Sequence, residues 1–425
     1  MLAYNLMQEL SQGALFPWRC HRCPSCASHE TRDRSFRTTR HAPRILLPPL
    51  TFAKLVAYKG TNLETQSLAL STPLAELHRR SGTQLGTWFG CSLPDHFGDW
   101  LAEYRQLREG VALLDKNYRA YLDFTGPDRV RYLNAILTNN IKDLRENHGT
   151  ISLFLNPQGR ILAEIETYNL PEKLFCLSYA SIREPLIAAL DKYIIMDDVT
   201  LTDRTADFAT LAVEGPKAAL VAEELTGVDP ADLAELETRL VSVQRIPCRL
   251  GKRSPGGTVS AEFLVDRAHA ETLWKILLEA TRKHGGGPAG YQALSAFRLE
   301  LGAPWFTYDF GEKQIPHEAG LQDSHISYTK GCYTGQEIVE RVRSRGQVNR
   351  VRVTLKYDTP QPPAPGTTLL SEGKEAGFTT RAAFSPALNA PIGMAYLRRE
   401  KSTPGSTVEL PEAAGSATVV TTPIA

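Results

Sequence analysis

One cysteine of the chain lies in a setting that favours chemical reactivity. Cys332 follows Lys330 and Gly331 in the segment KGCYTGQE, residues 330–337. Apolar residues at positions 338, 339 and 342 predict a helix that begins close after this cysteine. The positive end of the helix dipole and the Lys330 ammonium would both favour thiolate over thiol. We therefore predict that Cys332 is reactive, with a small buried hydrophobe in a glycine-rich turn as the alternative.

Strands and helices alternate in the part of the chain that must position this segment. Residues 118–125 have the alternation of a strand, and residues 128–137 carry an apolar helical face. Residues 150–155 and 160–168 are β-rich runs joined by the turn-forming sequence NPQG. The same patterns predict strands at 174–179, 208–214 and 262–266, and helices at 182–193, 216–225 and 269–283. This order predicts an α+β fold, with sheets covered by helices on one side.

The pattern changes after residue 345. Short β-rich runs there are separated by prolines between positions 360 and 365 and by Gly366 and Gly373, which is typical of a small β-barrel. We predict an α+β region of two modules over residues 72–345 and a C-terminal barrel domain over residues 346–425. Residues 1–71 are predicted to be a disordered or non-native extension.

The first sixty residues contain a cluster of possible metal ligands. Four ligands for zinc could be drawn from this cluster. The spacing is too tight for a usual zinc finger, because no second ligand pair follows at a distance that would enclose a small fold. We therefore predict no metal site. The cluster consists of Cys20, His21, Cys23, Cys26 and His29.

The composition is that of an ordinary globular protein. The chain has 425 residues, of which 42% are hydrophobic and 22% charged, and a formal net charge of +1. This balance indicates neither a nucleic-acid partner nor a membrane partner, and no apolar run is long enough to span a bilayer. Seven cysteines, an odd number in a long chain, do not indicate a disulfide framework. We expect a cytoplasmic protein.

The segment KGCYTGQE resembles the signature of the YgfZ family of folate-binding proteins. These proteins act in iron–sulfur cluster assembly or repair and are paralogues of the glycine-cleavage T-protein, an aminomethyltransferase that uses tetrahydrofolate. Together the similar segments cover roughly residues 73–400. The resemblance implies T-protein-like modules followed by a barrel, and tetrahydrofolate or a one-carbon derivative as cofactor. Other segments that resemble the superfamily are LDFTGPD (122–128), LTNN (137–140), RLELG (298–302), PHEAGL (316–321), GFTT (377–380) and IGMAY (392–396).

The resemblance also implies a folate site around the RLELG segment. In the T-protein a glutamate of this segment contacts the pterin, whose paired donors a carboxylate can accept bidentately. Glu300 occupies that position. Without the resemblance, Arg298 and Glu300 would be solvated charges on a helix with Leu294 and Leu301 on its apolar face. The predicted folate-contacting residues are Glu300, Arg298, Tyr308, Asp309 and Gln336.

A catalytic acid is implied by the early hairpin. The T-protein has paired aspartates after a glycine-containing turn, where this chain has Ala163 and Glu164 after Gly159. Glu164 is one methylene longer than aspartate, and a displacement of about 1 Å can cost a hundredfold in rate at a positioned group. Glu164 is therefore a candidate catalytic residue, together with Cys332 and Lys330.

Three classes of function remain open, so whether the chain is an enzyme also stays open. In the first, the protein binds tetrahydrofolate and uses Cys332 in iron–sulfur cluster assembly or repair. One thiolate cannot hold a cluster, which implies assembly or client proteins as partners. In the second, it is an aminomethyltransferase with Glu164 as the acidic group. In the third, it is a non-catalytic folate-binding scaffold. The cysteine motif favours the first class, because T-proteins lack that cysteine.

Overall fold

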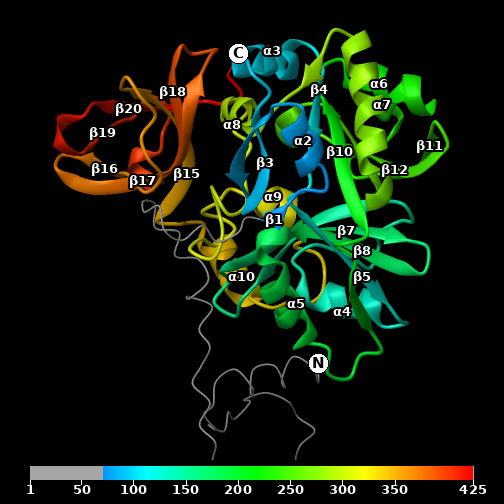
Figure 1. The fold of residues 1–425 in the computed structure, drawn as a ribbon. Coiled ribbons are helices and arrows are strands. Elements are labelled where there is room, and N and C mark those ends of the chain that lie inside the picture. Colours follow the sequence, from blue (N-terminus) through cyan, green and yellow to red (C-terminus); the bar gives the residue numbers. More distant parts are fainter. Residues whose placement is uncertain (1–69, 425) are drawn as a thin grey trace, which may run out of the picture. The chain divides into compact units, whose positions relative to one another are not determined.

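The computed structural model describes residues 70–424 (Figure 1). The possible zinc ligands Cys20, His21, Cys23, Cys26 and His29 lie outside the described residues. The described part opens with a three-stranded sheet in which β1 pairs parallel with β3, so Leu70 and Ser71 are strand residues although they fall in the predicted extension. The elements of this part are β1 (Leu70–Ser71), α2 (Ala75–Arg80), β2 (Gln84–Trp88), β3 (Cys91–His96) and α3 (Trp100–Glu109).

A five-stranded antiparallel sheet follows, in the order β6-β7-β8-β5-β9. Leu122 and Phe124 of β5 pack with the two helices on one face, while Tyr121 points to the other face and packs with Phe208. The NPQG turn joins β6 to β7, with the Gly159 amide donating to the Asn156 carbonyl at 2.9 Å. The elements are β5 (Arg119–Thr125), α4 (Arg129–Ile136), β6 (Gly149–Leu155), β7 (Ile161–Leu170), β8 (Lys173–Tyr179), α5 (Arg183–Asp191) and β9 (Thr200–Asp203).

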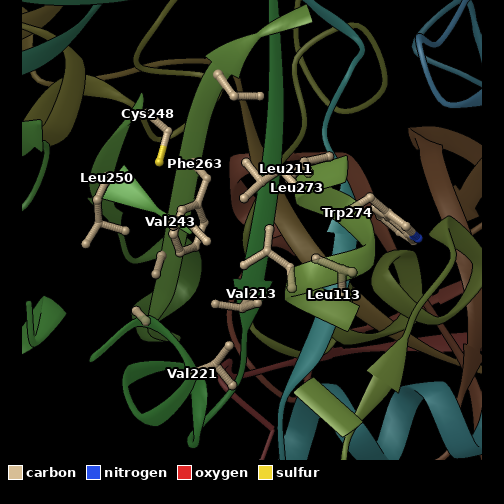
Figure 2. Close-up of a cluster of buried hydrophobic side chains, with 14 of the residues drawn as sticks. Leu113, Leu211, Val213, Val221, Val243, Cys248, Leu250, Phe263, Leu273 and Trp274 are labelled. Carbon is tan, nitrogen blue, oxygen red and sulfur yellow. The ribbon is translucent and has the colours of Figure 1, made fainter. Parts of the chain in front are cut away.

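A six-stranded sheet is arranged in the order β11-β12-β13-β10-β4-β14. Figure 2 shows Leu211 of β10 packed against Leu273 of α7 in the core on one face. Leu114 of β4 packs with Leu107 of α3 and Leu294 of α8 on the opposite face. Helices therefore cover both faces, where one was predicted. The elements are β4 (Ala112–Asp115), β10 (Phe208–Glu214), α6 (Ala218–Thr226), β11 (Thr238–Val243), β12 (Ile246–Arg253), β13 (Ser260–Asp266), α7 (Ala270–Lys283), β14 (Gly287–Pro288) and α8 (Tyr291–Glu300).

The last strands close into a barrel, drawn orange to red in Figure 1. Leu299 of α8 packs against Ile392 and Met394 of the barrel. The predicted α+β fold with a C-terminal β-barrel is confirmed, and the predicted boundary at residue 346 falls between α10 and the first barrel strand. The barrel strands are β15 (Arg350–Asp358), β16 (Thr368–Ser371), β17 (Lys374–Ser385), β18 (Ala390–Arg398), β19 (Thr407–Glu409) and β20 (Ser416–Val420).

The segment KGCYTGQE packs on the β6–β7 hairpin. Its first six residues lie between the short helix α9 (Gln322–His325) and α10 (Gln336–Arg345), and its last two begin α10. Tyr333 and Val339 are buried in one cluster with Leu155 and Ile161 of the hairpin. Gly335 has a left-handed φ of +81°, and a Cβ atom there would lie 2.6 Å from the Asn156 carbonyl oxygen. Glycine is therefore required at this position both by the backbone conformation and by the close approach to the turn.

The two glycines at the ends of α10 allow the effect of backbone conformation to be separated from the effect of close packing. Gly346 also has a positive φ, +71°, but nothing lies within 4 Å of a Cβ atom built there. We expect Gly346→Ala to lower the free energy of unfolding by about 1–2 kcal/mol through backbone strain alone. Gly335→Ala should lower it by about 3 kcal/mol or more, because the clash with Asn156 adds to the strain. Urea unfolding of the two variants measures the difference, and equal losses would contradict the packing argument.

Candidate functional site

A cavity of about 100 Å³ lies where the two larger sheets meet α8. Residues from both sheets, from α8 and from the loops around them line it. It is partly open to solvent. The lining residues are Phe89, Lys116, Tyr118, Arg119, Glu164, Glu166, Leu177, Ser178, Tyr179, Arg253, Pro255, Glu262, Tyr291, Leu294, Arg298, Pro304 and Trp305.

Aromatic rings form one wall of the cavity. The ring centroids of Phe89 and Tyr118 are 4.4 Å apart in a stacked arrangement, and those of Tyr118 and Tyr179 are 5.5 Å apart. Trp305 packs on Phe89 with a centroid distance of 5.1 Å. Because these rings contact one another, each is fixed by its neighbours. The wall can therefore receive a flat ring without first being ordered.

Charged side chains also line the cavity, and strand alternation explains why. On β7, Ala163 and Ile165 pack under the helices of the five-stranded sheet, so Glu164 and Glu166 point the other way. On β13, Ala261 and Phe263 pack in the core of the six-stranded sheet. Glu262 therefore faces the five-stranded sheet, and carboxylates from two sheets meet at one cavity.

These carboxylates are compensated by arginines. The Arg119 guanidinium contacts both oxygens of Glu262, at 2.7 and 3.1 Å, and Arg253 donates to Glu166 at 2.6 Å. Burial raises the pKa of Glu166, but the charges of Arg253 and Arg119 outweigh it, so the pKa is lowered overall. The pKa of Glu262 is lowered in the same way, against burial, by Arg119 and Lys116. Both carboxylates are therefore held ionised beside the cavity.

Three residues of α8 face the cavity with helical spacing. Tyr291, Leu294 and Arg298 are three and four positions apart and lie on one face of the helix. Arg298 is 2% exposed and pairs with the buried carboxylate of Glu214. Its Nη1 atom is buried and has no hydrogen-bond partner among residues 70–424. A ligand oxygen or nitrogen in the cavity could satisfy this donor.

Glu164 is held by donors from two other elements. The Tyr179 hydroxyl donates to Oε2 at 2.9 Å, and His325 Nε2 lies 3.1 Å from Oε1. Burial raises the pKa of Glu164, but the hydrogen bond and charge of His325, with Arg253 and Tyr179, lower it overall. Of the three predicted catalytic residues, Glu164 alone lines the cavity. It offers an ionised carboxylate beside an aromatic wall.

Glu300 does not reach the cavity. It lies two positions after Arg298 and therefore on another face of α8, where its side chain is 1% exposed. Its Oε2 accepts from the Tyr104 hydroxyl at 2.6 Å and from Arg108 at 3.0 Å. Its Oε1 accepts from the Ser385 hydroxyl and, at 3.3 Å, from the Ala387 amide of the barrel. This carboxylate is therefore already occupied by protein donors.

Asp309 and Tyr308 do not line the cavity, although each accepts a hydrogen bond from the backbone of a residue that does. Asp309 is 1% exposed and accepts from Arg381 at 2.7 Å, from the Thr380 hydroxyl and from the Trp305 amide. The Tyr308 hydroxyl accepts the Phe89 amide at 3.2 Å, behind the aromatic wall. Arg298 is thus the predicted folate-contacting residue that lines the cavity, while Gln336 lies at the start of α10.

Lys330 is engaged by backbone carbonyls rather than by Cys332. Its Nζ donates to the carbonyl oxygens of Asn134, Leu137 and Asn139, which closes the C-terminal end of α4. Burial lowers the pKa of Lys330 to about 7. Cys332 is exposed and precedes the first residue of α10 by four positions. Neither residue lines the cavity, so the structure does not assemble the predicted Lys330–Cys332 pair with Glu164.

Several cavity residues were not found from the sequence. Arg119, Glu166, Arg253 and Glu262 are charged strand residues, and His325, which contacts Glu164 but does not line the cavity, ends the short helix α9. The signal was present in β7, where Glu164 and Glu166 lie on either side of Ile165. The packing of the two sheets was needed to show that these charges meet. Among residues 70–424 no His, Cys, Asp and Glu cluster suits a metal ion, and no helix is long and apolar enough to cross a membrane.

Comparisons with known proteins agree with this architecture. The family model described as GCVT N-terminal domain matches residues 74–325, and the model described as glycine cleavage T-protein C-terminal barrel domain matches residues 350–424. The aminomethyltransferase of Desulfitobacterium hafniense is 27% identical over 340 residues, which are 80% of this chain and 93% of that protein. The aminomethyltransferase of Rubrobacter xylanophilus is 28% identical over 354 residues, with 80% and 93% covered.

A solved structure shows the same fold. The glycine cleavage system aminomethyltransferase T from Bartonella henselae superposes with a TM-score of 0.75 at 22% identity. The match covers 84% of this chain and 98% of that chain. It therefore includes the sheets around the cavity as well as the barrel.

The position of Glu300 predicts a structural rather than a ligand-binding effect. Glu300→Ala would leave the hydroxyls of Tyr104 and Ser385 and the Arg108 guanidinium without their acceptor. We expect the free energy of unfolding to fall by about 2–4 kcal/mol. Glu337→Ala is the control, because its exposed pair with Arg341 is worth less than about 0.5 kcal/mol. If Glu300→Ala keeps its stability in urea unfolding but loses folate affinity, Glu300 contacts the ligand and the structural interpretation is wrong.

Proposed function

The chain belongs to the glycine-cleavage T-protein family, and from this membership we propose that its cavity binds tetrahydrofolate for the transfer of a one-carbon unit. The aminomethyltransferases of the family use tetrahydrofolate as the one-carbon acceptor. The observation that supports the proposal most is the joining of an aromatic wall with carboxylates and arginines in one cavity. An aminomethyl transfer of the T-protein type is the activity that we propose first.

The chemistry of the cavity fits a pterin ring. A pterin is flat and aromatic, and its edge carries both donors and acceptors. Tyr118 and Tyr179 line the cavity with aromatic surface, and the unpaired Nη1 donor of Arg298 suits a ring acceptor. A space of about 100 Å³ is smaller than the roughly 300–1,000 Å³ of sites for whole drug-sized ligands. We therefore expect the ring to enter and the remainder of the folate to extend through the open side.

Glu164 has the properties required of the acidic group. A nitrogen that receives a carbon unit must lose a proton, and a carboxylate held ionised in the cavity can accept it or stabilise a nearby positive charge. Arg253 and His325 keep this carboxylate charged in spite of its burial. The side chain of Glu164 is one methylene longer than that of aspartate. It extends from β7, and Tyr179 and His325 fix the position of its carboxylate group.

Two cavity variants test this proposal. Tyr118→Leu should weaken tetrahydrofolate binding by about 1 kcal/mol, because a stacking face is lost. Glu164→Gln should bind with similar affinity but lower the transfer rate from an aminomethyl-lipoyl donor by about a hundredfold or more, because glutamine cannot take up the proton. Anaerobic calorimetry measures binding, and formation of methylenetetrahydrofolate measures transfer.

The control for both measurements is Glu337→Ala, which changes an exposed residue away from the cavity lining. Absence of tetrahydrofolate binding in the unaltered protein would overturn the proposal. Binding without transfer, in the unaltered protein and in all variants, would instead favour the non-catalytic scaffold.

A second function, in iron–sulfur cluster assembly or repair, is favoured by the setting of Cys332. Cys332 is exposed, whereas Cys91, Cys176 and Cys248 are buried. Burial raises the pKa of the Cys91 and Cys176 thiols to about 12 and that of Cys248 to about 11. Cys332 is therefore the thiol of residues 70–424 that can meet another protein. One thiolate cannot hold a cluster, so this function requires assembly or client proteins that supply further ligands.

Alkylation at neutral pH tests the reactivity of Cys332. We expect mass mapping to show that Cys332 labels at least about tenfold faster than Cys91, Cys176 or Cys248, because only thiolate reacts and these three thiols titrate at high pH. Lys330→Met should change the labelling of Cys332 less than about twofold, since Nζ is held by three carbonyls, while stability falls by about 1–3 kcal/mol.

Cys332→Ser then tests the second function itself. This variant should keep the fold and tetrahydrofolate binding, because Cys332 does not line the cavity, but fail to complement a defect in iron–sulfur protein maintenance. Full complementation by Cys332→Ser would exclude the function, and labelling of Cys332 no faster than the buried cysteines would remove its chemical basis.

A further inference from the structure

A buried histidine connects the cavity carboxylate to the protein surface. Glu164 lines the cavity, His325 is 6% exposed, and Ser324 beside it is exposed. Nε2 of His325 is 3.1 Å from Glu164 Oε1, and Nδ1 is 2.7 Å from the Ser324 hydroxyl oxygen. Both ring nitrogens are thus engaged, one on each side. We propose that His325 is a positioning residue that directs the Glu164 carboxylate into the cavity and keeps it ionised there, a role that rests on the proposed folate site.

The backbone around His325 fixes the ring. The carbonyl of His325 accepts the Thr138 hydroxyl at 2.6 Å, and its amide donates to the Leu321 carbonyl at 3.0 Å. When Nδ1 accepts the Ser324 hydroxyl, Nε2 carries the hydrogen and donates it to Glu164. In this tautomer each ring nitrogen has one hydrogen-bond partner, and Glu164 receives the bond from Nε2.

The other groups that face Glu164 cannot replace His325. Tyr179 of β8 gives one hydrogen bond, to Oε2. Arg253 of β12 contributes positive charge, but its hydrogen bonds go to Glu166, which adds an opposing negative charge from β7. Loss of His325 would leave Oε1 without a donor in a buried site. Burial, which favours the protonated acid, would then be less opposed.

Loss of His325 should raise the pKa of Glu164, and this direction determines the expected pH dependence. A carboxylate whose pKa rises becomes protonated as the pH falls, so any interaction that needs the ionised form is lost at the acidic end. In the unaltered protein the lowered pKa of Glu164 keeps the group ionised through the neutral and mildly acidic range. In His325→Leu the pKa of Glu164 should rise, so that the carboxylate becomes protonated within that pH range.

Infrared spectroscopy can observe Glu164 directly. The difference between the unaltered protein and Glu164→Gln isolates the carboxylate band of Glu164, which is then titrated between about pH 4 and pH 8. We expect the midpoint of the Glu164 titration to rise in His325→Leu. In His325→Gln, which retains an N–H donor, the midpoint should lie between those of the unaltered protein and His325→Leu. His317→Leu is the matched control, because His317 bonds Tyr328 away from the cavity and its loss should leave the midpoint unchanged.

The transfer rate gives the second measurement. Formation of methylenetetrahydrofolate by His325→Leu, relative to the unaltered protein at the same pH, should fall by about tenfold or more from pH 8 to pH 5, and the relative rate of His317→Leu should change by less than about twofold. Melting curves show whether each variant is folded. If His325→Leu is unfolded, His325→Gln is used in its place.

The two proposals can fail separately. An unshifted Glu164 midpoint in both His325 variants would overturn the positioning role. Because the infrared titration needs no ligand, a protein that binds no tetrahydrofolate would refute the folate site, while the band position would still decide the role of His325.

Discussion

The contact on which the site depends is the ion pair between Arg119 and Glu262. Arg119 begins β5 of one sheet and Glu262 lies in β13 of the other, and the guanidinium contacts both carboxylate oxygens. Both groups are buried, so each would be costly without the other. This mutual requirement holds the two sheets together at one place. The cavity lies beside that place, since both residues line it, and the same charges would act on any ligand there.

Two faces of helix α8 have different roles: one lines the cavity and the other contacts α3 and the barrel. Arg298 faces the cavity, while Glu300, two residues later, binds Tyr104 of α3 and Ser385 of the barrel. Asp309 adds a second buried link to the barrel through Arg381. The barrel is therefore attached to the same helix that lines the cavity. A change at the barrel interface would reach the ligand site through α8, without any barrel residue lining the cavity.

The parts of the fold that could be predicted are those in which one pattern runs through one element. The alternation in residues 208–214 corresponds to β10, and the helical face in residues 269–283 corresponds to α7. Among the strands before residue 116, β1 and β3 were missed because β1 has two residues and β3 contains Pro94, so neither shows alternation. The site was predictable only in part. A resemblance gives a position along the chain, as for Glu300, but the direction of a side chain depends on the elements that surround it.

The segment from α9 to α10 explains how two candidate chemistries exist in one chain. At its start, His325 binds Glu164 in the cavity, whereas Cys332, seven residues later, is exposed. Between them Lys330 is bonded to carbonyls at the end of α4, and Tyr333 is buried against the hairpin. The segment is therefore anchored on both sides of Lys330, and movement at the thiol is not transmitted freely to the carboxylate. The proposed aminomethyl transfer at Glu164 would not require Cys332, and the proposed thiol chemistry at Cys332 would not require the carboxylate. The chain can thus carry an exposed cysteine without altering any contact of Glu164.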